Sequence, residues 1–194
     1  GFPAGTNAEY FLDVFLTIHS VPKSTVKAVP MKLEDMGDAL ATGRIDAVSI
    51  WNPYLIGFGK ELGDKVVTFY GELIYVESFP VTAKKAFVAT HPEAVKKLIR
   101  ALLKAEAFVR EHPSDSIDIV AGSIKTGKET VKEVWPCYEF RVKLDQSLMV
   151  NLENQARWAI RRKLSDRKEI PNFQDFFYLD GLSAVKPDAI TMIR

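Results

Sequence analysis

Residues 38–54 constrain the fold of this chain more than any other stretch. Their sequence, DALATGRIDAVSIWNPY, joins the end of a helical pattern, a glycine stop, a short apolar run and an aromatic-proline turn. Gly43 suits the left-handed position that follows many helices, and the apolar run at 47–50 is typical of a strand covered on both faces. Trp51 and Asn52 would then stand at the carboxyl edge of an α/β sheet, where ligands bind.

The first 70 residues alternate short apolar segments with helical patterns. Thr6 and Glu9 have the Thr-x-x-Glu spacing of a capping box, which predicts the start of the first helix. Helices are expected at about 6–18, 33–43 and 53–61, and strands at 26–29, 47–50 and 66–70. This β-α-β-α-β order favours a mostly parallel sheet with helices on both faces.

The pattern changes after Tyr75. Residues 77–83 are β-like, and the chain is almost wholly helical from His91 onward. Further helices are expected at about 92–112, 116–124, 128–134 and 145–164. The sequence therefore predicts an α/β unit to about residue 78, followed by a helical unit without a sheet of its own.

Composition excludes several classes of function. The formal net charge of the 194 residues is +1, so there is no basic field for nucleic acid. The single cysteine, Cys137, excludes a disulfide framework and a cysteine-cluster metal site, and the three histidines lack metal-ligand spacing. We therefore expect no nucleic-acid partner, no metal and no cofactor.

Residues 1 to about 180 resemble the extracytoplasmic solute-binding proteins of nitrate, sulfonate, taurine and thiamine-precursor import systems. The matching segments are PAGT at 3–6, ALATGRIDA at 39–47, WNPY at 51–54, HPEAV through RALLKA at 91–105, ARWAI at 156–160 and IPNF at 170–173. The resemblance implies the type II periplasmic-binding fold of ABC-importer receptors. It identifies 1–78 as the α/β ligand-binding lobe, 79–90 as a hinge or return crossover, and 91–194 as the helical part of the other lobe.

The sheet of that other lobe is absent from this chain, which begins at Gly1 without an initiator Met. We therefore expect a fragment or a processed product of a longer receptor. Helix faces that would pack on the absent strands would be exposed, so self-association of the fragment is a further expectation.

The resemblance implies a receptor that captures a small anionic or heterocyclic organic solute in a cleft between two lobes. Its partner would be a membrane ABC permease, and its location periplasmic or extracytoplasmic, with a membrane anchor as an option in the full-length form. One alternative is the ligand-sensing domain of a signalling receptor or regulator. A less favoured alternative is an enzyme of the thiamine-pyrimidine biosynthesis type, because those relatives use a Cys-rich motif and Cys137 stands alone.

Eight residues are candidates for the ligand site: Gly5, Thr6, Asn7, Trp51, Asn52, Tyr54, Glu77 and Ser78. The loop before the first helix would offer backbone N–H groups and a positive dipole end to an anion, although Thr6 would also serve as a plain helix cap. Trp51 would form an apolar wall or seal the core, with Asn52 orienting a polar group and Tyr54 beside them. Glu77 and Ser78 would line the cleft at the hinge.

Overall fold

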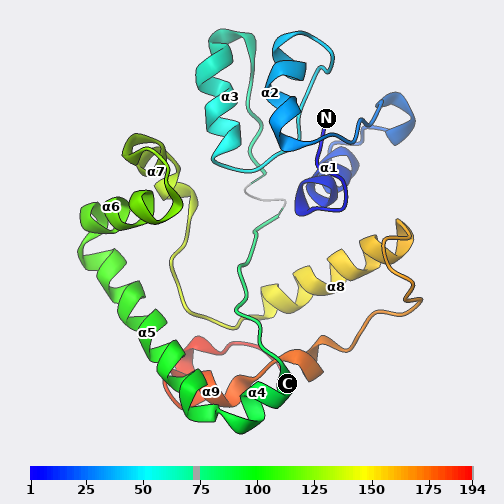
Figure 1. Cartoon of the computed structure of the whole chain (residues 1–194). Coiled ribbons are helices and arrows are strands. Elements are labelled where there is room, and N and C mark those ends of the chain that lie inside the picture. Colours follow the sequence, from blue (N-terminus) through cyan, green and yellow to red (C-terminus); the bar gives the residue numbers. More distant parts are fainter. Residues whose placement is uncertain (72–74, 194) are drawn as a thin grey trace. The chain divides into compact units, whose positions relative to one another are not determined.

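The computed structural model describes residues 1–71 and 75–193 of the chain (Figure 1). These residues form two compact units, Gly1–Glu77 (unit 1) and Ser78–Arg194 (unit 2). The predicted lobes 1–78 and 91–194 include 72–74 and 194, which lie outside the described residues. Their assignment as lobes joined by a hinge at 79–90 stays a prediction.

Three α-helices form most of the regular structure of unit 1, and all three were predicted from the sequence. They are α1 (Asn7–Ile18), α2 (Leu33–Ala41) and α3 (Tyr54–Leu62), with 3₁₀ turns at Lys23–Thr25 and Gly63–Lys65. In the ribbon, α2 and α3 lie side by side (Figure 1). Gly37 of α2 makes this close approach possible, because a Cβ there would stand 2.9 Å from the Phe58 ring.

The core of unit 1 lies under α2. Met36 and Ala39 have no exposed area, and Ile45 is 6% exposed. Gly43 has a φ of +71°, as the left-handed position after α2 requires. The helix-stop prediction at Gly43 is therefore confirmed.

The predicted parallel sheet is wrong for the described residues. Within residues 1–71 and 75–193, the paired positions are two isolated parallel bridges, Phe2 with Pro30 in unit 1 and Leu144 with Ile190 in unit 2. Phe2 donates to the Val29 carbonyl at 3.2 Å and accepts from the Met31 N–H at 3.0 Å. On the other side of the first segment, the Ser49 N–H donates to the Gly1 carbonyl at 2.9 Å. Three extended segments of unit 1 are therefore joined by single pairings, and they do not form a sheet.

Two residues of the first segment explain why the pairing stops. Pro3 has no N–H to donate toward the segment at 47–50, so the ladder on that side ends after Gly1. Gly5 then turns the backbone away at a φ of +71°. The predicted strand at 66–70 is also unpaired among the described residues, and its Val67 and Phe69 side chains are 77% and 71% exposed.

Unit 2 is a set of helices joined by loops. They are α4 (Lys85–Thr90), α5 (Pro92–Glu111), α6 (Pro113–Ile124), α7 (Lys128–Val134), α8 (Gln146–Arg161) and α9 (Leu179–Ser183), with 3₁₀ turns at Trp135–Cys137, Phe173–Phe176 and Pro187–Ala189. Contacts join α5 to α6 and α9, and α6 to α7. Ile117, Ala121 and Val131 form the buried core between α6 and α7, and Trp135 packs against it.

Glu106 of α5 ties two loops of unit 2 to that helix. Its carboxylate accepts from the Val142 N–H at 2.8 Å and from Lys186 Nζ at 3.2 Å. Burial, the largest influence, raises the pKa of Glu106, but the hydrogen bonds from Val142 and Lys186 outweigh it. The net pKa of this carboxyl is therefore lowered, and it stays charged at neutral pH.

Candidate functional site

The amino terminus of α1 brings together two of the predicted ligand-site residues. Asn7, the first residue of α1, donates from Nδ2 to Oε1 of Glu77 at 2.5 Å. Tyr10, three residues further along α1, and Tyr75, two residues before Glu77, meet edge to face with ring centroids 5.4 Å apart. A hydrogen bond and a ring contact therefore join α1 to residues 75–77.

Glu9 changes the expected character of this helix end. Its carboxylate accepts from the Gly5 N–H at 2.7 Å, and the residue is only 4% exposed. The Thr6 hydroxyl donates to the Pro3 carbonyl at 2.7 Å and makes no side-chain cap to α1. The predicted capping box is therefore wrong in its pairing, and a buried carboxylate already occupies the Gly5 N–H that was assigned to an anion.

The segment that carries Trp51 is attached to the same helix end. Ser49 is buried, and its hydroxyl donates to the Ala8 carbonyl of α1 at 2.8 Å. Trp51 and Asn52, two and three residues further on, are half-buried, and Tyr54 at the start of α3 is 41% exposed. The described bonds join Asn7 directly to Glu77 and connect the aromatic segment to α1 through Ser49.

Asn52 contains an unusual polar atom. Its Oδ1 is buried and has no hydrogen-bond partner among the described residues. Buried amide oxygens are nearly always hydrogen-bonded, because an unpaired one costs about 1–3 kcal/mol.

Glu77 has a carboxyl group whose pKa is raised. Desolvation by its neighbours raises the pKa, and the hydrogen bond from Asn7 offsets part of that increase. The residue as a whole is exposed, so the effect concerns the carboxyl group rather than the entire side chain. Ser78, the neighbouring candidate, is exposed and begins unit 2.

Glu77→Gln is expected to stabilise unit 1 at neutral pH. A carboxyl group with a raised folded-state pKa binds protons better in the folded chain, so it reduces stability as pH rises through its two pKa values. The glutamine amide keeps an acceptor for Asn7 without a charge. The thermal midpoint of unit 1 should rise at pH 7 and stay unchanged near pH 3, and the exposed Glu61→Gln serves as the control. Equal shifts of the Glu77→Gln midpoint at both pH values would contradict this account.

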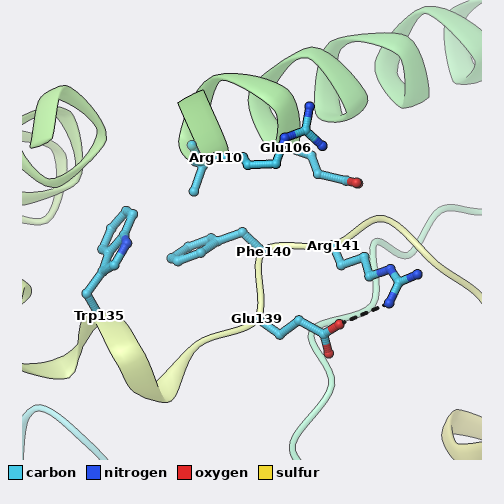
Figure 2. A pocket seen from close by; sticks show the side chains of 7 residues that line it. Glu106, Arg110, Trp135, Glu139, Phe140 and Arg141 are labelled. Atoms are coloured by element: carbon cyan, nitrogen blue, oxygen red, sulfur yellow. Dashed lines mark ion pairs between the residues drawn. The ribbon is translucent and has the colours of Figure 1, made fainter. Parts of the chain in front are cut away.

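A hollow lies in unit 2, at residues that the sequence analysis did not propose as a site (Figure 2). This α5 hollow has a volume of about 330 Å³ and is lined by Glu106, Arg110, Trp135, Glu139, Phe140 and Arg141. Its residues come from α5 and from the segment at 135–141, which are about 30 residues apart in the chain. Tertiary packing brings these two segments together, so no local sequence motif predicts the hollow.

No group of three or more His, Cys, Asp and Glu side chains could hold a metal ion within residues 1–71 and 75–193. In the same part of the chain, no helix has both the length and the apolar character that crossing a membrane requires.

Comparison with known proteins gives several matches. The family described as NMT1/THI5 like matches residues 1–116. A protein of Brucella abortus (strain 2308) is 31% identical over 138 residues, 68% of this chain and 42% of its own length, and it carries the provisional name of a binding protein. A Brucella suis biovar 1 (strain 1330) relative, similarly named, matches to the same extent.

A more distant relative comes from Bacillus subtilis (strain 168). It is 25% identical over 146 residues, 74% of this chain and 43% of its own, and its provisional name is aliphatic sulfonates-binding protein. The chain thus spans less than half the length of these curated relatives, and no solved structure matches it significantly. Nothing in these comparisons supports the predicted self-association. With the family match covering more than half of the residues, the chain belongs to the NMT1/THI5-like family of solute-binding proteins.

Proposed function

We propose that the chain is part of a receptor that binds a small organic solute and delivers it to a membrane ABC permease. Family membership supports the solute-binding role, and the relatives named as binding proteins point to a function other than catalysis. An extracytoplasmic location and the permease partner are part of the same proposal. No feature of the described residues favours the sensor-domain or biosynthetic-enzyme alternative.

The Oδ1 of Asn52, which has no hydrogen-bond partner among the described residues, is the observation that carries the proposal. It stands three residues after Ser49, whose bond to Ala8 anchors the segment beside the start of α1. A solute that donates a hydrogen bond to this oxygen would remove the penalty of an unpaired buried acceptor. Trp51, next to it, would supply the apolar wall that holds a ring.

The side chains around α1 favour one of the two predicted kinds of solute. Glu9 accepts from the Gly5 N–H, and Glu77 accepts from Asn7, so this helix end already has its own carboxylates. A second anion would meet their charges at short range. A heterocyclic solute with an N–H donor would instead find an acceptor in the Oδ1 of Asn52. We therefore propose a nitrogen heterocycle rather than an anion.

Titration of the full chain tests the proposal. We expect 4-aminopyrimidine to bind with measurable heat and to shift the indole N–H resonance of Trp51, whereas nitrate and methanesulfonate should bind far more weakly. Asn52→Ala should raise the dissociation constant about tenfold, since a hydrogen bond to a buried acceptor is lost. Asn154→Ala on α8 is the matched amide control and should leave binding unchanged.

Two outcomes would count against this function. If none of the three compounds moved the Trp51 resonance, a solute site in unit 1 would be contradicted. If nitrate or methanesulfonate bound more tightly than 4-aminopyrimidine, solute binding would stand but the heterocycle assignment would be wrong.

A further inference from the structure

We infer that the α5 hollow is a second binding site and that it takes a small aromatic anion, an aryl carboxylate or aryl sulfonate. Its volume of about 330 Å³ lies at the lower end of the range for ligand pockets, about 300–1,000 Å³. It therefore suits one ring that carries an acid group. The site is separate from the residues of the proposed function, because every lining residue belongs to unit 2.

The wall of the hollow is aromatic. Trp135 and Phe140 face one another with ring centroids 4.4 Å apart and planes inclined by 32° (Figure 2). Trp135 is held in place by its packing on the core between α6 and α7. Phe140 is 39% exposed, so part of its ring is open to a ligand. A planar ring would extend this aromatic contact and cover apolar surface that water now touches.

Two guanidinium groups stand at the rim, and each is weakly paired. Arg110 Nη2 lies 3.2 Å from Oε1 of its neighbour Glu111, and Arg141 Nη1 lies 3.5 Å from Oε1 of Glu139. All four side chains are more than half exposed. Exposed pairs of this kind contribute little stability, so an acid group could displace them at small cost. The planar guanidinium also suits the two oxygens of a carboxylate or sulfonate.

The two carboxylates of the hollow already have partners of their own, so the hollow favours a negatively charged ligand. Glu106 is bound by Val142 N–H and by Lys186 Nζ, as described above. If Arg141 turned toward a ligand, Glu139 would still pair with Lys143 Nζ, which lies 3.1 Å from its carboxylate. An anion would therefore gain guanidinium donors while Glu106 and Glu139 keep partners of their own, and the exposed Glu111 would return to solvent. A cation would have to break bonds that these carboxylates already make.

Titration of the ¹⁵N-labelled full chain with benzenesulfonate and benzoate tests the inference. Both should shift the indole N–H resonance of Trp135 and leave that of Trp51 unchanged, and benzamide, which has no charge, should bind at least about tenfold more weakly. Arg141→Gln and Phe140→Leu should each raise the dissociation constant about tenfold. Arg157→Gln is the control, because Arg157 pairs with Glu153 at 3.4 Å on α8, outside the hollow.

Several results would overturn the site. They are the absence of a Trp135 shift with either anion, equal affinity for benzamide, and an effect of Arg157→Gln as large as that of Arg141→Gln. A shift of Trp51 alone would place the anion in unit 1 and would equally remove the α5 hollow as its site. Retention of the native amide spectrum by both hollow variants is required, and Phe140→Leu keeps an apolar side chain for that reason.

Discussion

Replacing Met36 by alanine is expected to lower the free energy of opening of α2 by about 3 kcal/mol. Met36 has no exposed area and is the largest side chain in unit 1 that is completely buried among the described residues. Alanine would remove its apolar contacts and leave a cavity that the helix backbone cannot close. Hydrogen exchange of the α2 amides should then speed up by about 100-fold.

Met36→Leu is the matched control, since it keeps the volume nearly constant and should cost less than about 1.5 kcal/mol. Exchange at α5, in the other unit, should be the same in both variants. If Met36→Ala slowed or hardly changed exchange at α2, the core of unit 1 would not lie where the burial of Met36 and Ala39 places it.

Helices of this chain could be predicted from the sequence because their signals are local. The helices expected at about 6–18 and 128–134 correspond closely to α1 and α7. Pro92 marks the first residue of α5, as expected from its tolerance at that position. Asp145 caps α8 by accepting from the Leu148 N–H at 3.1 Å. Each of these features needs only neighbouring residues.

The strand predictions failed because the pairing of a strand depends on residues that are distant in the sequence. An apolar run such as 66–70 forms a strand only if another segment offers it a ladder, and periodicity says nothing about that partner. In the chain described, Val67 and Phe69 remain exposed. At the first segment, Pro3 removes the donor that the next pairing would use. The expected helices were therefore found, and the expected parallel sheet was wrong.

The candidate site also depends on contacts between residues that are distant in the sequence. The sequence singled out both Asn7 and Glu77, and a hydrogen bond joins them across a separation of 70 positions. It missed the role of Glu9, because the Thr-x-x-Glu spacing predicts a cap on Thr6 and cannot reveal a bond to Gly5. The α5 hollow was missed entirely, since only tertiary packing brings residues 135–141 to α5.

Glu106→Gln is expected to destabilise unit 2 by about 2 kcal/mol at pH 7. The substitution removes the charge that strengthens the hydrogen bonds from Val142 and Lys186, and both bonds are partly buried. The free energy of opening of α5, obtained from exchange of its amides, measures the loss. Glu153→Gln on α8 removes a more exposed carboxylate, 3.4 Å from Arg157, and should change stability by less than about 0.5 kcal/mol.

The pH dependence separates this electrostatic role from simple packing. Because the pKa of Glu106 is lowered in the folded chain, its contribution is complete above the ordinary glutamate pKa of about 4.3 and is lost as pH falls through the lowered value. The difference between the native chain and Glu106→Gln should therefore shrink steadily below about pH 4. A difference that stays constant down to pH 2 would mean that Glu106 acts through its shape, and that its charge does not hold the two loops to α5.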